Sequence, residues 1–406
     1  MTNRSRSLIL VGGSVRAAAV DARRAGYEVI AVDRFGDRDL REICKLWVEY
    51  DADHQWITRL ADQHSAPIVP VGGFSWPADR KSTSPIGSFL NSRLVAYPDE
   101  NSLARINSPA LLGKLAEQCG ASFPETRQLM DGCVEIVFRP IRTQSAASAQ
   151  WLVKPVCHAG GVGIHVAAEH AKLAPGQFLQ RKIKGNPIGA NYLCLPGPSG
   201  PVVRFLGVYG GLTHRRNPCH RFLYGGSFGP LTLAPSTMET LKTLGDRCAS
   251  ALQLVGLFNI DFICQPDQSL VLLEVNPRYS GSMELIGLES GSDEPLLSLI
   301  DWHLTAYRMR DGDAEARCGE FPFREPTPPS AAYCKRIVYA KKEMKPVTLS
   351  SGVNVAVCDL PLENALIPAG APVCTIVISG ATSLKQAVQL SARTASRIRR
   401  QSLQQS

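Results

Sequence analysis

The sequence predicts a mixed α/β protein of two or three domains, and three observations support this. The chain has 406 residues, which is more than one compact domain usually holds. Its first 33 residues follow the order strand, helix, strand that is typical of a doubly wound α/β domain. Two apolar runs joined by a short polar turn, over residues 261–278, predict a β-hairpin, and short strands and turns follow residue 331.

The composition narrows the class of protein. The hydrophobic content of 44% and charged content of 20% are typical of a soluble globular chain. No apolar run approaches the length of a membrane span, so we expect no membrane partner. A chain of this length does not need disulfides, so we expect a cytoplasmic protein with reduced thiols. The basic and then apolar start suggests a signal peptide, but Arg16 interrupts the apolar run, which favours a buried strand.

The net charge argues against a nucleic-acid-binding protein, and the cysteines argue against a zinc protein. The net charge of +8 is spread along the chain without interleaved aromatic residues, which favours small anionic ligands over nucleic acid. The 12 cysteines contain no C-x-x-C pair, so we expect reduced thiols and no zinc site. A thiol nucleophile at Cys219, beside His220, is an alternative that no other residue pattern supports.

The first predicted domain covers residues 1–106. We expect strands at residues 7–11 and 27–33, a helix between them up to about residue 24, a strand with its loop at 66–73 and another strand at 94–98. Gly12-Gly13 after the first strand lacks the spaced glycines of G-x-G-x-x-G, so an NAD(P)-dependent oxidoreductase is only an alternative. Arg16 is either a contact for an acidic substrate or a surface residue.

The second predicted domain covers residues 107–325. Asn107-Ser108-Pro109 opens a helix that ends before Gly120, because a polar cap followed by proline is typical of a helix start. A strand at residues 151–155 carries Lys154 and leads into Gly160, Gly161 and Gly163, and such glycines let a backbone fold over phosphates. An apolar strand that leaves into a polar turn is expected over 178–185, further strands at 189–195 and 202–209, and a helix at 237–254.

The hairpin carries two carboxylates in apolar surroundings, Asp261 and Glu274. Burying a carboxylate is costly unless a cation pairs with it, and two side by side would repel each other. Asn276 lies two residues beyond Glu274 and therefore on the same face, and Arg278 follows on that face again. Carboxylate and amide oxygens suit Mg²⁺, whereas the alternative is a set of ordinary edge-strand charges.

Together, an acid followed by E-x-N-P-R, with K-P-x-x-x-x-G-G-x-G upstream, resembles the ATP-grasp superfamily and its members related to biotin carboxylase. The resemblance implies ATP with Mg²⁺ or Mn²⁺, the metal being held by Asp261, Glu274 and Asn276. It places Lys154 and Arg278 beside the phosphates, as catalytic groups. The glycines would form a lid over the nucleotide, and the adenine would lie against Gln180, Arg181, Lys182 and Ile183.

The resemblance also implies a layout in three parts. A Rossmann-like domain over 1–106 precedes a two-lobed ATP-grasp domain over 107–325, whose lid covers about 107–185. A β-rich lobe with a final basic helix then occupies 331–406. Glu284, just beyond the hairpin, would either orient the acceptor or favour a helix N-terminus electrostatically.

The implied reaction is ADP-forming carboxylate–amine ligation, with a small-molecule carboxylate and an amine as substrates. Members of this kind occur in cofactor biosynthesis, and a homodimer is a further expectation. Two departures leave an ATP-binding module with degenerate catalysis as an alternative. Pro109 stands where a phosphate-binding lysine is usual, and Asn186-Pro187-Ile188 stands where a ribose-binding acid is usual.

Overall fold

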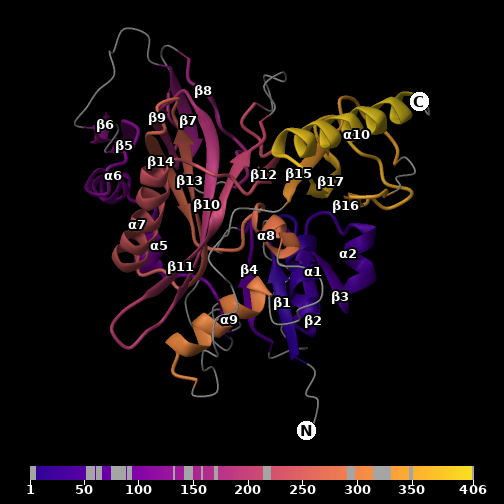
Figure 1. Cartoon of the computed structure of the whole chain (residues 1–406), viewed down its shortest axis with the longest axis horizontal. Helices are drawn as coiled ribbons and strands as arrows, with labels where there is room; N and C mark the ends of the chain where they lie inside the picture. The colour runs from indigo at the N-terminus through magenta and orange to yellow at the C-terminus, as the bar shows by residue number, and fades with distance from the viewer. Residues whose placement is uncertain are drawn as a thin grey trace. The chain divides into compact units, whose positions relative to one another are not determined.

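The computed structural model describes residues 6–51, 60, 66–74, 88, 94–130, 133–140, 150–156, 159–168, 172–213, 221–289, 298–313, 331–346 and 351–404. The chain forms two compact units (Figure 1). Unit 1 comprises Met1–Tyr97, Gly225–Pro230 and Arg278–Ser406. Unit 2 comprises Pro98–Tyr224 and Leu231–Pro277.

Unit 1 begins with a four-stranded parallel sheet in the order β3 (Leu46–Glu49), β2 (Tyr27–Asp33), β1 (Arg6–Val11), β4 (Ile68–Pro70). Helix α1 (Arg16–Arg24) connects β1 to β2, and α2 (Arg38–Ile43) connects β2 to β3. The continuous apolar runs of β1 and β2 are buried, as expected for parallel strands. The predicted strand–helix–strand order of the first 33 residues is therefore confirmed.

The rest of unit 1 holds two helices, an antiparallel set of strands and a long final helix. The two helices are α8 (Met283–Glu289) and α9 (Leu299–Arg310). The strand order is β12 (Gly226–Gly229), β15 (Ala332–Tyr339), β17 (Pro372–Ala381), β16 (Val355–Cys358).

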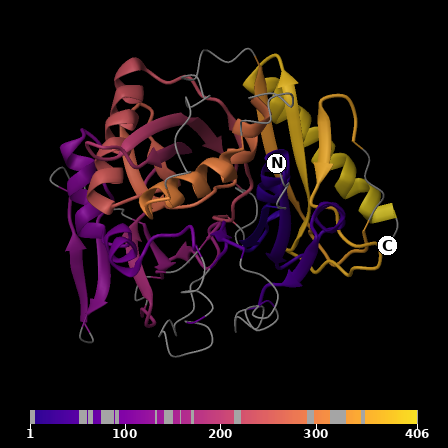
Figure 2. The same ribbon diagram turned by 90° about the horizontal axis from the view of Figure 1, so that it is seen from below.

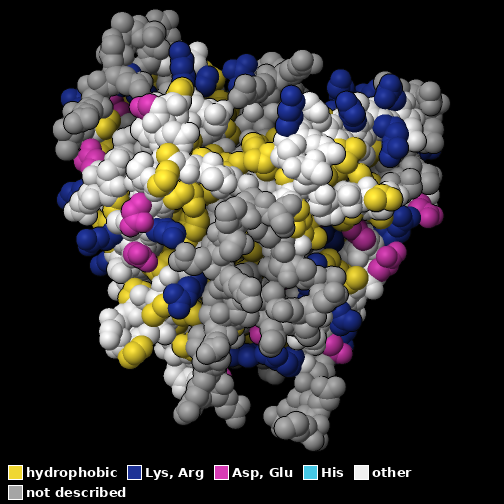
Figure 3. Space-filling view, viewed as in Figure 1, with side chains coloured by type: hydrophobic (Ala, Val, Ile, Leu, Met, Phe, Trp, Pro, Cys, Tyr) yellow, Lys and Arg dark blue, Asp and Glu magenta, His cyan; other side chains and the backbone are white. Residues whose placement is uncertain are grey.

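Helix α10 (Leu384–Gln404) packs along β15 and β17 (Figure 2). Its buried side carries small residues such as Ala387 and Ser391, which allow close approach to the strands. Its outer side is basic, and Figure 3 shows Lys and Arg side chains gathered over it. The exposed basic residues of α10 are Lys385, Arg393, Arg397 and Arg400.

Unit 2 contains a four-stranded antiparallel arrangement in the order β14 (Leu270–Asn276), β13 (Gly256–Cys264), β10 (Asn186–Leu195), β11 (Val202–Gly211). Among its described residues are the helices α5 (Glu100–Ile106), α6 (Pro109–Gln118) and α7 (Pro235–Leu252). Helix α7 packs against β10 and β11, and α6 packs against β14.

A second sheet of unit 2 has the order β6 (Cys133–Phe138), β5 (Thr126–Met130), β9 (Gln177–Arg181), β7 (Trp151–Pro155), β8 (His165–Val166). All of its neighbouring strands are antiparallel. This sheet carries Lys154 on β7 and Gln180 on β9. Together with Arg181, the last residue of β9, it therefore supplies three residues for which the sequence predicts a role.

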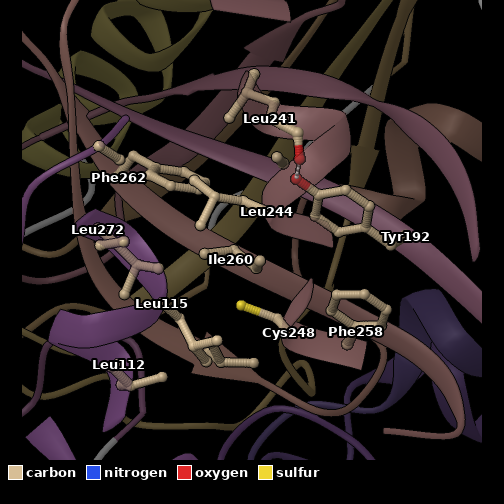
Figure 4. Packing of buried hydrophobic residues seen from close by; sticks show 14 of the residues in the cluster. Leu112, Leu115, Tyr192, Leu241, Leu244, Cys248, Phe258, Ile260, Phe262 and Leu272 are labelled. Atoms are coloured by element: carbon tan, nitrogen blue, oxygen red, sulfur yellow. Dashed lines mark hydrogen bonds between the residues drawn. The ribbon is translucent and has the colours of Figure 1, made fainter. Parts of the chain in front are cut away.

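The core of unit 2 holds the hairpin of β13 and β14 in place (Figure 4). The rings of Tyr192 and Phe258 stack with their centroids 4.7 Å apart, and the Tyr192 hydroxyl donates to the Leu241 carbonyl over 2.8 Å. Ile260 and Phe262 on β13 both point into this core. Since strand side chains alternate, Asp261 between them faces away from the core.

The structure differs from the sequence prediction at several elements. Residues 94–98 form only an isolated bridge between Val95 and Ile68, because Pro98 has no N–H to continue a ladder. Helix α7 ends at Leu252 rather than 254, since Gln253 adopts a left-handed conformation with φ of 55°. Helices α2, α5 and α9 and strand β3 were not predicted. The predicted domain boundaries stay predictions, and the proline-rich boundary at residues 321–330 lies outside the described residues.

No helix in the part of the chain that the structure describes is both long and apolar enough to cross a membrane.

Candidate functional site

The β13–β14 hairpin places Asp261 and Glu274 directly opposite each other in an antiparallel ladder. The turn is closed by a hydrogen bond from the Gln265 N–H to the Ser269 carbonyl over 2.9 Å. Asn259 and Asn276 form another direct pair of the same ladder. Because residues two apart on a strand share a face, these four side chains lie on one face of the hairpin.

The Asn276 side chain connects the two carboxylates. Its amide nitrogen donates to Asp261 Oδ2 over 3.1 Å and to Glu274 Oε1 over 3.2 Å. All three side chains are half-buried, so they are only partly accessible to water. The oxygens of two carboxylates and one amide form a donor set of the kind that Mg²⁺ takes, completed in such sites by water and phosphate oxygens.

No group of three or more His, Cys, Asp or Glu side chains among the described residues is arranged to hold a metal ion. The hairpin set has only two carboxylates, so it would depend on the Asn276 oxygen and on oxygens of the ligand. This composition suits Mg²⁺, which is usually held by one or two carboxylates plus substrate phosphates.

Lys154 belongs to the same unit but to the other sheet, and only 6% of it is exposed. Burial lowers the pKa of Lys154, and the negative charges of Glu274 and Asp261 oppose this lowering. The ammonium group therefore lies within the electrostatic field of both hairpin carboxylates. The structure thus brings Lys154 near the predicted hairpin residues Asp261, Glu274 and Asn276, which lie in a distant part of the sequence.

The glycine-rich loop after β7 has a backbone that only glycine adopts easily. Gly160, Gly161 and Gly163 have φ angles of 61°, 78° and 79°. A Cβ on Gly161 would lie 1.8 Å from the Phe222 carbonyl oxygen, so no larger residue fits. The Tyr224 N–H also donates to the Gly160 carbonyl over 2.8 Å. The loop is thus anchored on residues 222–224, and its predicted contact with phosphates stays a prediction.

The segment predicted to lie against adenine is partly engaged within unit 2. The Gln180 side chain is 2% exposed and donates to Thr126 Oγ1 over 3.4 Å. The N–H groups of Arg181 and Lys182 donate to the carbonyls of Glu125 and Gln150, over 2.9 and 2.8 Å. Hydrogen bonds to the edge of the adenine base would therefore come from Ile183 and from carbonyl groups of residues 180–183.

The predicted roles of Arg278 and of Cys219 stay untested. Arg278 belongs to unit 1 and is half-buried, and its predicted role beside the phosphates stays a prediction. Cys219 and His220 lie outside the described residues, as do the preceding basic residues 214–216.

Unit 1 contains a buried ionic network around Arg16, which is 4% exposed. Its guanidinium forms ion pairs with Glu284 and with Asp359, the latter at 2.9 Å. Lys335 Nζ also pairs with Glu284, at 2.6 Å. Burial opposes ionisation of Asp359, yet the positive charge of Arg16 lowers the pKa of Asp359 to about 2. Arg16 is therefore neither a surface residue nor directed at solvent, and Glu284 is held by two cations.

Asp37 lies beside this network and was not singled out from the sequence. It is 8% exposed, and its side chain makes no hydrogen bond or ion pair with any residue that the structure describes. Burial, together with the charges of Asp359, Asp33 and Asp39, raises the pKa of Asp37 to about 8. The density of acids over residues 33–39 was the only sequence signal for it.

Comparison with known proteins identifies one domain. Residues 122–282 match the family model of the ATP-grasp domain. Over 126 residues, 31% of this chain, the sequence is 27% identical to the carbamoyl phosphate synthase large chain of Rubrobacter xylanophilus. That match spans 12% of the relative's length.

Solved structures share the fold at low sequence identity. Biotin carboxylase from Campylobacter jejuni, solved with βγ-ATP, has a TM-score of 0.65 and 12% identity, covering 95% of this chain and 89% of its own. The L-amino acid ligase from Bacillus licheniformis has a TM-score of 0.63 and 14% identity, covering 97% and 98%. The biotin carboxylase domain of Hydrogenobacter thermophilus 2-oxoglutarate carboxylase, a dimer solved with MgADP and bicarbonate, has a TM-score of 0.66 and 14% identity, covering 96% and 89%.

Proposed function

This chain carries an ATP-grasp domain over residues 122–282, and on that basis we propose that it is an ATP-dependent ligase. In the proposed reaction ATP donates its γ-phosphoryl group to a carboxylate, and an amine displaces phosphate from the acyl phosphate. One observation carries the proposal: Asp261 and Glu274 are direct cross-strand partners, linked by the Asn276 amide, with buried Lys154 in their field.

The proposed nucleotide is ATP with Mg²⁺, and the solved relatives with βγ-ATP and MgADP support this choice. Asp261, Glu274 and Asn276 would hold the ion, which neutralises negative charge on the phosphates. Mn²⁺ has a similar preference for oxygen ligands and is the proposed substitute.

The chain's own groups would mainly position the reactants and balance charge, which is most of what phosphoryl transfer requires. Lys154 would donate hydrogen bonds to phosphate oxygens from a buried position, where an electrostatic interaction is stronger than in water. Arg278 would offer a second, planar cation to phosphate oxygens. The glycine loop, anchored on residues 222–224, would keep water from an acyl phosphate that hydrolyses readily.

We further propose a small carboxylate and an amine as substrates, and a homodimer as the assembly to test first by sedimentation. The relatives act on different substrates, since one was solved with bicarbonate and another is an L-amino acid ligase. We also propose that the chain acts in cofactor biosynthesis, which a screen of carboxylate and amine substrates would test.

Positional isotope exchange tests the proposal directly. ATP labelled with ¹⁸O in the β–γ bridge is incubated with enzyme, Mg²⁺ and each carboxylate of a panel, with the amine left out. Reversible acyl phosphate formation should scramble the label with one class of carboxylate, and adding the matching amine should then release ADP.

A specific feature supports a second candidate, an ATP-binding module with degenerate catalysis. Pro109 is the first residue of α6, and the Ser108 hydroxyl before it accepts a hydrogen bond from the Leu111 N–H over 3.3 Å. A proline therefore stands at the position where a phosphate-binding lysine is usual. ATP binding without label scrambling or ADP release for any member of the panel would favour this candidate over the ligase.

A further inference from the structure

Gly189 is a glycine in the interior of strand β10, beside the candidate metal site. It lies directly opposite Asp261 on β13, and Asp261 lies directly opposite Glu274 on β14. The neighbours of Gly189 on β10, Ile188 and Ala190, belong to the core of unit 2. Since strand side chains alternate, position 189 faces away from this core, on the same side as Asp261. Gly189 therefore continues the row of the two carboxylates onto a third strand.

The backbone of β10 does not explain the glycine. Gly189 does not have a left-handed φ, and the irregularity of the β10–β11 ladder lies between Asn191 and Tyr192. A glycine in a strand interior is less stable than alanine, and it often marks a place where a ligand or another backbone comes close. The three atoms nearest to a Cβ at position 189 all belong to side chains. A close backbone is therefore not the reason for this glycine.

The missing side chain leaves room beside one oxygen of Asp261. A Cβ at position 189 would lie 3.2 Å from Asp261 Oδ1 and 2.8 Å from Asn259 Nδ2. The other oxygen, Asp261 Oδ2, accepts the hydrogen bond from the Asn276 amide nitrogen over 3.1 Å. The two oxygens of this carboxylate thus have different surroundings, because Oδ2 faces an amide and Oδ1 faces the space at Gly189.

We propose that Gly189 is a specificity-determining residue, whose missing side chain keeps room beside Asp261 Oδ1 for oxygen ligands of a divalent ion. The inference rests on the proposed function, because it concerns the same ion. Mg²⁺ demands near-ideal octahedral geometry and usually keeps several waters, so a site with two carboxylates must leave space for water or phosphate oxygens. A methyl group at position 189 takes part of that space and changes no charge.

The test measures Mn²⁺ binding rather than turnover. Electron paramagnetic resonance gives the dissociation constant of Mn²⁺, with and without a non-hydrolysable ATP analogue, for the wild type, Gly189→Ala and Gly189→Val. We expect Gly189→Ala to weaken Mn²⁺ binding by about 10- to 100-fold, as is typical of changes next to metal ligands, and Gly189→Val to weaken it further. A loss seen only with the analogue assigns the space to a phosphate oxygen, and a loss in both conditions assigns it to water.

The alternative is that Gly189 only makes room for the Asn259 amide. That amide donates to the Ala190 carbonyl over 3.2 Å and accepts from Asn276 Nδ2 over 3.4 Å. In Asn259→Ala the atom that lies 2.8 Å from the added Cβ is gone, so adding Gly189→Ala to this background isolates the contact with Asp261. We expect the added substitution to weaken Mn²⁺ binding by about 10- to 100-fold here too.

Two controls separate the loss of space from a loss of structure. In the Asn259→Ala background, Gly189→Ala should not lower the melting temperature, because alanine is favoured over glycine in a strand interior. Gly211→Ala is the matched variant, since Gly211 on β11 is also a half-buried glycine of unit 2. Its Cβ would lie 3.3 Å from Pro187, a contact as tight as the one with Asp261. This variant should leave Mn²⁺ affinity unchanged.

The outcomes distinguish this inference from the proposed function. A wild type that fails to bind Mn²⁺ with nucleotide contradicts the proposed function itself. A wild type that binds, together with Gly189→Ala and Gly189→Val variants of equal affinity, overturns only the role of Gly189. Equal affinity of Asn259→Ala with and without Gly189→Ala would also overturn it, as would a Gly211→Ala variant that loses as much affinity as Gly189→Ala.

Discussion

Asp261 and Glu274 are direct partners across the antiparallel strands β13 and β14, and the amide nitrogen of Asn276 donates to both carboxylates. Like charges placed directly opposite each other destabilise an antiparallel pair. The hydrogen bonds from the neutral Asn276 amide and the nearby side chain of Lys154 offset this repulsion. The hairpin therefore favours a positive charge between Asp261 and Glu274.

Glu274→Gln should lower kcat for ADP release by at least two to three orders of magnitude, the usual effect of losing one key electrostatic group. The change keeps the size of the side chain but removes the charge that attracts a divalent cation. Steady-state assay of ADP at saturating ATP and Mg²⁺ measures it, with the melting temperature as the control for folding. Turnover close to the wild-type rate would rule out the metal site on this hairpin.

Lys154→Ala should raise the KM for ATP sharply, because a buried ammonium in the field of the hairpin carboxylates is lost. The matched control is Lys114→Ala, which removes an exposed lysine on α6 of the same unit and should leave the KM unchanged. Initial rates over a range of ATP concentrations give both values. Unchanged ATP kinetics in Lys154→Ala would show that this lysine does not contact the nucleotide.

Asp37→Asn should make the protein more stable, and increasingly so as the pH rises from about 4 to about 8. The pKa of Asp37 is about 8 in the fold, against an ordinary value of 3.8. The folded state therefore binds the proton more tightly than the unfolded state, so the group's contribution to stability is full below pH 4 and is lost as the pH rises toward 8. Asparagine carries no titrating proton and avoids this loss.

Urea unfolding of the two proteins at several pH values between 5 and 8 measures the effect. The difference in free energy of unfolding should grow by up to about 1.4 kcal/mol per pH unit. Asp39→Asn serves as the control, because Asp39 accepts the N–H groups of Asp359 and Leu360. It should destabilise the protein at every pH. A difference between wild type and Asp37→Asn that does not vary with pH would contradict the raised pKa.

Gly161→Ala should disturb the glycine-rich loop far more than Gly176→Ala does. Both glycines belong to unit 2 and have nearly equal positive φ angles, 78° and 77°. A Cβ at Gly176 meets no atom within 4 Å, whereas one at Gly161 lies 1.8 Å from the Phe222 oxygen. Gly176→Ala should therefore cost only the backbone strain, about 1–2 kcal/mol.

Hydrogen exchange read by mass spectrometry gives the location of the effect. In Gly161→Ala, exchange should rise at residues 159–165 and at 222–224, because the Tyr224 N–H loses its acceptor at Gly160. In Gly176→Ala, exchange at residues 222–224 should stay at the wild-type level. Equal behaviour of the two variants would mean that the loop is not anchored on Phe222.

Much of the secondary structure was predictable because its signals are local. Strand β2 begins and ends at the predicted residues, and α6 begins at Pro109 as its polar cap and proline indicate. The shared face of Glu274 and Asn276 follows from the two-residue period of a strand. The strand predicted at residues 94–98 was wrong, because pairing at a sheet edge depends on a partner that local sequence does not describe.

The sequence by itself determined the hairpin, its two carboxylates and the amide beside them, since alternation and turn chemistry act over a few residues. Only the tertiary structure decided that Lys154, on another sheet, lies in the electrostatic field of those carboxylates and that Asn259 accepts a hydrogen bond from Asn276. It also decided that Arg16 is paired with Glu284 and Asp359 rather than exposed. These relationships depend on burial and on contacts between distant segments, because a charge is paired by whatever the fold packs against it.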